Sequence, residues 1–197
     1  MSLEVRMAHD AEAAPAAGLH AQRITEGFLP TLGAAFLTRL YRRIERDPGS
    51  FLVVALEDDR VVGMCACTED LGALYRAFVV RDGVVAGLRS APRIIRSLPR
   101  VIETLRYPGA EDAAALPEAE VLAVAVDSAR SGRGIGRAVV EAALAEFDRR
   151  GTEQVKVVAG GDNDAALGLY RATGFVDAAR LEVHAGTESV VLVRTAS

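Results

Sequence analysis

The feature that constrains this chain most is a valine-rich segment that leads through a glycine-rich loop into an amphipathic helix. The apolar segment covers Glu120–Val126, the loop runs from Asp127 to Arg133, and a helix is predicted over Gly134–Arg150 with Gly151 as its stop. Glycine lets a backbone turn sharply and approach a ligand closely. A helix start offers unpaired N–H groups that favour phosphate. The segment therefore predicts a diphosphate cradle.

The loop fits neither of two common nucleotide-binding motifs. A dinucleotide fingerprint needs G-x-G-x-x-G or G-x-G-x-x-A. Counting from Gly132 or Gly134 places Arg137 or Val139 at the last position, so both frames fail. A Walker loop needs Gly-Lys followed by Ser or Thr, and this triplet does not occur in the sequence. A tight turn between a strand and a helix, without any ligand, stays open as an alternative.

Hydrophobic periodicity on both sides of this segment predicts an α/β fold with a mixed sheet. Strands are expected at residues 3–8, 51–56, 60–68, 155–158, 175–184 and 189–194, and helices at about 10–24, 32–46 and 163–173. Asp10 is expected to be the N-cap of the first helix. Residues 71–110 also have a helical pattern, which Pro92 and Pro99 interrupt. No linker is visible, so residues 1–197 are expected to form one domain.

Composition and charge exclude several classes of protein. Hydrophobic residues make up 50% of the chain, charged residues 25%, and the formal net charge is −4, so no general attraction to nucleic acid or anionic membranes is expected. No apolar run approaches the ~20 residues that span a bilayer. Residues Met1–Arg6 lack the apolar core of a signal peptide. The protein is therefore expected to be cytoplasmic.

The histidines and cysteines do not predict a metal site. His9, His20 and His184 are scattered singly, whereas Cys65 and Cys67 lie two residues apart on a predicted strand. Their thiols should share one face of that strand. A disulfide between them would strain the strand, so both are expected to be small buried hydrophobic residues.

Two blocks of the sequence together resemble the acetyl-CoA signature of the GNAT superfamily of N-acyltransferases. Ala125-Val-Asp127 with Gly132-Arg-Gly-Ile-Gly136 resembles the family's Arg/Gln-x-x-Gly-x-Gly/Ala loop. Residues Asn163–Phe175 are similar to its Asn-x-x-Ala-x-x-Leu-Tyr-x-x-x-Gly-Phe helix. Ser131 stands at the family's Arg/Gln position, with Arg130 one place earlier. The grip on phosphate is therefore expected to be rearranged or weaker.

The resemblance implies a single GNAT-like domain with a mixed, mostly antiparallel, twisted sheet flanked by helices, in which residues 71–110 are a helical insertion. Acetyl-CoA would be the cosubstrate, and no metal is required. The backbone of Val124 and Val126 would pair with the pantetheine arm, where this strand diverges from the strand at 155–158. Asn163 would touch the coenzyme or act as a helix N-cap, and the two roles are compatible. The diphosphate would be held by the amides around Arg133, Gly134, Ile135, Gly136 and Arg137.

The resemblance also implies two catalytic side chains. Tyr170 would protonate the departing CoA thiolate, unless it is only another apolar residue of its helix. Glu120 would take the proton from the attacking ammonium. Glu118 and a water relay stay open as alternative bases, and both carboxylates could instead be solvated charges at a strand entrance. The oxyanion would meet a main-chain N–H near Val124.

The expected acceptor is the primary amine of a small molecule, which attacks directly in a ternary complex. An amino sugar linked to a nucleotide is one candidate, because an arginine face could meet its phosphates; a solvated helix face is the more ordinary explanation. That face consists of Arg89, Arg93, Arg96 and Arg100. A protein N-terminus or lysine as the acceptor, and a non-catalytic acyl-CoA-binding module, are the alternatives. A homodimer is compatible with the sequence.

Overall fold

The computed structural model describes residues 2–24, 33–78, 81, 116–184 and 187–196. Its strands form a seven-stranded sheet in the order β1-β2-β3-β4-β5-β7-β6. Neighbouring strands are antiparallel except for β4 and β5, which are parallel. The strands are β1 Leu3–Met7, β2 Ser50–Glu57, β3 Arg60–Thr68, β4 Glu120–Val126, β5 Gln154–Gly160, β6 Val176–His184 and β7 Thr187–Thr195. This mixed, mostly antiparallel sheet confirms the predicted fold class.

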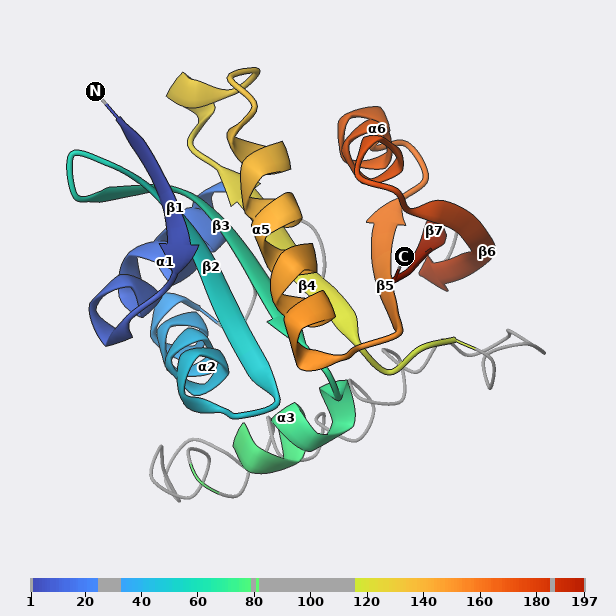
Figure 1. Ribbon diagram of the computed structural model, residues 1–197, viewed down its shortest axis with the longest axis horizontal. Helices are drawn as coiled ribbons and strands as arrows, with labels where there is room; N and C mark the ends of the chain where they lie inside the picture. Colours follow the sequence, from blue (N-terminus) through green and yellow to red (C-terminus); the bar gives the residue numbers. More distant parts are fainter. Residues whose placement is uncertain (1, 25–32, 79–80, 82–115, 185–186, 197) are drawn as a thin grey trace.

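Helices cover both faces of the sheet (Figure 1). They are α1 Asp10–Arg23, α2 Ala34–Arg46, α3 Leu71–Phe78, α5 Ile135–Arg150 and α6 Asp164–Ala172, with a short 3-10 turn η4 at Ser128–Arg130. Apolar residues of α5 and α6 share one buried cluster, and those of α1, α2 and α3 share a second cluster on the opposite face. Along the described residues, no helix combines the length and the apolar character needed to cross a membrane.

The ends of several elements differ from the prediction in ways that capping explains. The N-cap of α1 is His9 rather than Asp10, because Glu12 reaches back to accept from the His9 backbone N–H in a capping box. Helix α2 begins after Gly33, whose φ of 85° breaks the helix on that side. Helix α5 ends at Gly151 with a φ of 79°, as predicted.

The strands expected at 51–56 and 60–68 form an antiparallel hairpin, β2 and β3, and its turn is one residue shorter than the gap between those ranges. Its turn consists of Asp58 and Asp59, which have φ values of 48° and 61°. Glu57, which follows the strand expected at 51–56, is instead the last residue of β2 and is buried.

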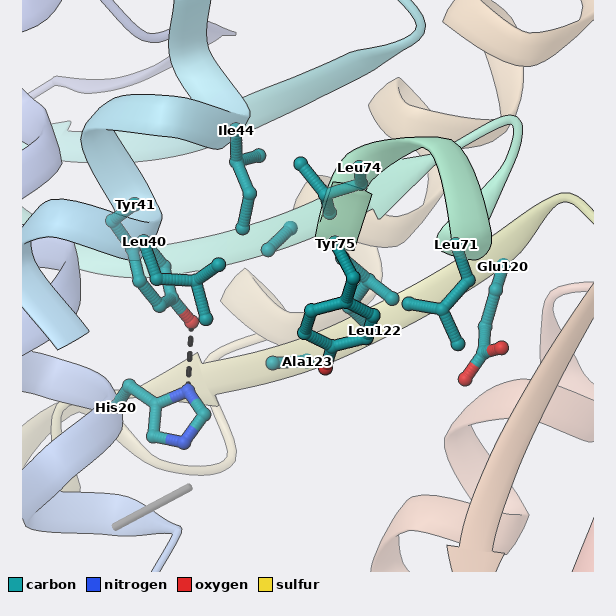
Figure 2. A pocket seen from close by; sticks show the side chains of 11 residues that line it. His20, Leu40, Tyr41, Ile44, Leu71, Leu74, Tyr75, Glu120, Leu122 and Ala123 are labelled. Atoms are coloured by element: carbon teal, nitrogen blue, oxygen red, sulfur yellow. Dashed lines mark hydrogen bonds between the residues drawn. The ribbon is translucent and has the colours of Figure 1, made fainter. Parts of the chain in front are cut away.

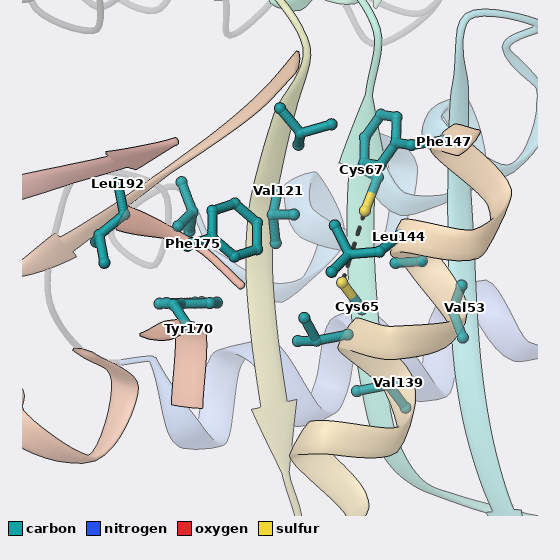
Figure 3. Close-up of a cluster of buried hydrophobic side chains, with 14 of the residues drawn as sticks. Val53, Cys65, Cys67, Val121, Val139, Leu144, Phe147, Tyr170, Phe175 and Leu192 are labelled. Atoms are coloured by element: carbon teal, nitrogen blue, oxygen red, sulfur yellow. Dashed lines mark hydrogen bonds between the residues drawn. The ribbon is translucent and has the colours of Figure 1, made fainter. Parts of the chain in front are cut away.

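The two cysteines lie where they were predicted, on one face of β3. Their Sγ atoms are 3.6 Å apart, and both thiols are free and buried beneath α5 (Figure 3). Burial raises the pKa of the Cys67 thiol well above its usual value. They act as small hydrophobic residues of the core.

The predicted helical segment 71–110 is described only in part. Its first eight residues form α3, which packs against α2. The four arginines of the predicted basic face, from Arg89 to Arg100, lie outside the described residues.

Candidate active site

Strands β4 and β5 pair with each other only briefly and then separate. Their parallel pairing includes only Glu120 with Lys156 and Val121 with Val157. Beyond this point β4 continues to pair with β3 as far as Val126, while β5 continues with β7. The two strands diverge toward their carboxyl ends (Figure 1). One edge of each strand therefore lacks a partner strand there.

The backbone of β4 turns alternate peptide groups toward this unpaired edge. The N–H of Asp127 donates to the Val62 carbonyl at 2.9 Å, so Asp127 pairs toward β3. Because hydrogen-bonding direction alternates along an antiparallel strand, the N–H and C=O groups of Val126 and Val124 point the other way, toward β5. These are the residues that the sequence analysis selected for pairing with a pantetheine arm.

The loop after β4 is shaped by its own side chains and by glycine. The Asp127 carboxylate accepts from the Ala129 N–H at 3.0 Å, which begins the η4 turn. Gly132 and Gly134 then adopt φ values of 75° and 78°, a left-handed conformation that other residues rarely adopt. Gly134 is the N-cap of α5, so the loop opens directly into the helix.

The first turn of α5 presents three backbone amides without a protein acceptor. The first hydrogen bond of this helix runs from the Ala138 N–H to the Gly134 carbonyl at 3.0 Å. The amides of Ile135, Gly136 and Arg137 precede it, and no acceptor for them exists within the part of the chain that the structure describes. Such a helix start attracts anions.

The arginines of the loop divide into one that is bound within the protein and two that face solvent. Arg130 donates to Glu57 at 2.5 Å and to Asp127 at 2.7 Å. Arg133 is exposed and lies 3.4 Å from the second oxygen of Glu57, and Arg137 is exposed on α5. The arginine before Ser131 therefore braces the loop, and the two solvent-facing cations remain accessible to a ligand.

Glu57 is a site residue that the sequence analysis missed. Its side chain is 5% exposed, and the hydrogen bond from Arg130 holds the pKa of this carboxyl below its usual value. Glu57 and Arg130 are 73 positions apart in the sequence, and they meet only because the end of β2 lies beside the loop after β4.

Asn163 has the N-cap role that was expected of it. It precedes α6, and its side-chain oxygen accepts from the Ala166 N–H at 3.1 Å. It follows β5 closely, near the carboxyl end of that strand.

Tyr170 lies in the core between α6 and the sheet. Its ring meets that of Phe175 edge to face, with centroids 5.7 Å apart (Figure 3). Burial raises the pKa of the Tyr170 phenol well above its usual value, and the nearby thiols of Cys65 and Cys67 contribute to the increase. The side chain is therefore a neutral phenol at physiological pH and carries a proton.

Glu120 is a buried carboxyl on the opposite face of the sheet. Its Oε2 lies 3.5 Å from the Nζ of Lys156 and has no hydrogen-bond partner among the described residues. The Lys156 ammonium also donates to the Pro117 carbonyl. Burial raises the pKa of Glu120, and Lys156 partly opposes the increase. Glu118 is exposed and can be a solvated charge, whereas Glu120 is buried and cannot.

A pocket lies next to Glu120, between the sheet and helices α1, α2 and α3 (Figure 2). Glu120 lines one part of it and His20 another, with Tyr41 and Tyr75 among the other lining residues. The rest of the lining is apolar and includes Leu40, Ile44, Leu71, Leu74 and Leu122. His20 had no signal in the sequence beyond being a single histidine on a helix.

The sequence profile of the acetyltransferase (GNAT) family matches residues 21–175. This range holds the separated strands, the amide-lined loop and α6, and the chain belongs to this family. Within the described residues, no group of three or more His, Cys, Asp or Glu side chains is placed to hold a metal ion.

Curated relatives match shorter stretches. A mycothiol acetyltransferase of Kocuria rhizophila is 39% identical over 69 residues, which are 35% of this chain and 22% of that protein. The N-alpha-acetyltransferase RimI of Mycobacterium tuberculosis is 48% identical over 58 residues, 29% of this chain and 35% of that protein. The chain thus spans about a fifth to a third of the length of these relatives.

Solved structures resemble the whole chain in fold. An N-acetyltransferase from Staphylococcus aureus Mu50 has a TM-score of 0.65 at 11% identity and covers 99% of each chain. The protein yncA of Salmonella typhimurium, solved with its cofactor acetyl-CoA, has a TM-score of 0.64 at 16% identity and covers 99% of this chain and 94% of its own. At these identities the likeness concerns the fold.

Proposed function

We propose that this protein is an N-acetyltransferase that moves an acetyl group from acetyl-CoA to the primary amine of a small molecule. The observation that carries the proposal is the early separation of β4 from β5 directly before a helix start with unpaired amides. The separation leaves backbone groups for an extended arm, and the helix start suits a diphosphate. Coenzyme A has both parts in one molecule.

The described residues fit this coenzyme without a metal. Val124 and Val126 offer backbone groups on the unpaired edge of β4 to the pantetheine arm. The amides of Ile135, Gly136 and Arg137 bind the diphosphate, and Arg133 and Arg137 add positive charge. Asn163 keeps its N-cap bond and contributes its remaining polar atoms from the start of α6.

Catalysis proceeds by direct attack in a ternary complex. Glu120 accepts a proton from the acceptor ammonium, and the resulting amine attacks the thioester carbonyl. A backbone N–H near Val124 stabilises the oxyanion. When the carbon–sulfur bond breaks, Tyr170 donates its proton to the CoA thiolate, and the second proton on the acylated nitrogen returns to the Tyr170 phenolate, which leaves the neutral amide and the CoA thiol. The raised pKa keeps this phenol protonated until the thiolate forms, although it also makes the transfer less favourable.

A small-molecule acceptor is favoured by the pocket beside Glu120, which is lined by side chains of three helices and the sheet. The relatives named mycothiol acetyltransferase are consistent with it. Because another relative is named N-alpha-acetyltransferase RimI, a protein N-terminus is the competing candidate for the acceptor. Release of CoA from acetyl-CoA with pools of small amines and with pools of peptides distinguishes the two.

The coenzyme assignment is tested with Gly134 and Gly151, the two glycines that cap the N-terminal and C-terminal ends of α5. Gly134 and Gly151 have nearly equal positive φ values, 78° and 79°, and a Cβ at either has no atom within 4 Å. Valine at either position strains the backbone to a similar extent, but only Gly134 lies in the cradle. We expect Gly134→Val to lose coenzyme binding in calorimetry and Gly151→Val to retain it. Equal affinities in the two variants would remove the cradle from the proposal.

A further inference from the structure

Two residues that line the pocket beside Glu120 each have a buried polar atom without a hydrogen bond. One is Oε2 of Glu120, which has an ion pair with the Lys156 ammonium at 3.5 Å but no hydrogen bond, and the other is Nε2 of His20, which has no hydrogen-bond partner within the described residues. His20 is 3% exposed and Glu120 is 8% exposed. Buried polar atoms are nearly always hydrogen-bonded. Since His20 and Glu120 line the same pocket, a single ligand there would supply the hydrogen bond that each atom lacks.

The orientation of His20 is fixed by its other ring nitrogen. Its Nδ1 lies 2.7 Å from the Tyr41 hydroxyl, which also lies 3.6 Å from the Met64 sulfur. The imidazole meets the Tyr41 ring edge to face at a centroid distance of 5.7 Å. Tyr41 is itself buried, so the imidazole is held in place and Nε2 stays turned away from this contact.

The charge state of His20 limits what it can bind. Burial lowers the pKa of this imidazole, so it is neutral at physiological pH. In a neutral ring Nε2 donates or accepts according to which nitrogen carries the hydrogen. A hydroxyl satisfies both cases, because it can donate and accept.

The pocket between these atoms is mostly apolar. Figure 2 shows His20 and Glu120 on opposite sides of the drawn residues, with Tyr75 and leucine side chains between them. Leu40, Ile44 and Leu74 are buried there. A ligand with many hydroxyl groups would bury several of them against these apolar side chains without hydrogen-bond partners, which disfavours its binding.

We propose that the acceptor is a primary amine with an apolar body and a hydroxyl group, whose ammonium meets Glu120 and whose hydroxyl bonds to His20 Nε2. This rests on the proposed function, since it names the acceptor class of the same site. His20 is then a specificity residue, distinct from the groups that handle protons and coenzyme.

The test compares amines that differ by one hydroxyl. Tyramine and phenethylamine form one such pair, 5-aminopentanol and pentylamine a second, and glucosamine represents the sugar amines. Binding to the wild-type protein is measured by calorimetry with coenzyme A present, and the same series is repeated with His20→Phe. Phenylalanine keeps the aromatic contact with Tyr41 but cannot bond to a hydroxyl.

We expect the hydroxylated member of at least one pair to bind about tenfold more tightly to the wild type, the effect of one buried hydrogen bond. In His20→Phe this ratio should fall to about one. Independently of any variant, the Nε2 resonance of His20 in ¹⁵N spectra of the wild type should shift on addition of the preferred amine. Equal affinities within both pairs, an unshifted Nε2 or tightest binding of glucosamine would overturn the assignment.

Failure of the acetyltransferase proposal has a different signature. It would appear as loss of coenzyme binding in calorimetry or as absent CoA release with every amine. Amine binding and the Nε2 shift do not require turnover, so the acceptor assignment is judged separately.

Discussion

The ammonium of Lys156 lies 3.5 Å from a carboxylate oxygen of Glu120, and their side chains are only 7% and 10% exposed. Burial disfavours the charged carboxylate, whereas the neighbouring cation favours it. The net effect is a pKa above the ordinary value, closer to the pH at which a general base works well. Lys156 therefore tunes the pKa of the proposed base.

Replacing Lys156 with methionine should move the acidic limb of the pH–rate profile to higher pH. Glu120 is active when deprotonated, so activity is present above its pKa and is lost as the pH falls through it. Without the Lys156 cation, the effect of burial on Glu120 is no longer partly offset, so the pKa of Glu120 rises further. The measurement is kcat/KM against pH, with Lys156→Arg as the control that keeps the charge. A limb that stays in place in the methionine variant would show that Glu120 does not govern it.

Replacing Glu120 with glutamine should lower kcat by roughly 10²–10⁴-fold, the usual contribution of a general base. Coenzyme affinity should change little, because the cradle lies at the other end of β4. The acidic limb should also disappear, since glutamine does not titrate. Exposed Glu118 is the matched control, and Glu118→Gln should leave kcat near the wild-type value. A large loss in that variant instead would move the base to Glu118.

Replacing Tyr170 with phenylalanine removes only the hydroxyl and keeps the edge-to-face contact with Phe175. If Tyr170 is the proton donor, kcat should fall by roughly 10²-fold while thermal stability and coenzyme affinity stay near their original values. Steady-state rates on a good acceptor and calorimetry with coenzyme A give the two readouts. Unchanged rates would leave Tyr170 with a packing role alone.

Replacing Glu57 with glutamine should weaken coenzyme binding through the loop. Arg130 loses its charged partner at 2.5 Å, and the chain before the cradle then orders only when the coenzyme binds. A roughly two- to tenfold loss of affinity is expected. Glu141, which pairs with Arg137 on the surface of α5, provides the control: Glu141→Gln should not weaken binding. Similar losses in both variants would indicate a general charge effect.

The carboxyl of Glu146 should account for part of the acid sensitivity of the fold. Hydrogen bonds from Arg149 and Arg150 lower its pKa to about 2. A depressed pKa contributes stability above the unfolded value of about 4.5, and that stability is lost as the pH falls toward 2. Glu146→Gln should cost on the order of 1 kcal/mol at pH 6 and nearly nothing at pH 2. Urea unfolding at both pH values measures this difference, and an equal cost at both would exclude the ion pairs as its source.

Local patterns predicted most elements because each one has its own sequence signal. The bounds of β4 and the stop at Gly151 follow from a valine run and a single glycine. Asn163 precedes α6 in a sequence that already favours an N-cap. By contrast, the N-cap of α1 depends on a reciprocal bond between His9 and Glu12.

The parts of the site that sequence reasoning missed depend on contacts between distant segments. Glu57 meets Arg130 across the sheet, and Lys156 meets Glu120 across two parallel strands. His20 became a candidate only because α1 places it in the same pocket as Glu120. Neither propensity nor spacing encodes such pairs, because they depend on how the elements pack.

The most direct measurement of the central claim follows the backbone amides of Ile135, Gly136 and Arg137 by ¹H–¹⁵N spectroscopy during a titration with coenzyme A. We predict that these resonances shift together and saturate with one binding constant, while the Gly151 amide at the far end of α5 stays unchanged. Saturable binding of coenzyme A that leaves the three amides unshifted would contradict the account.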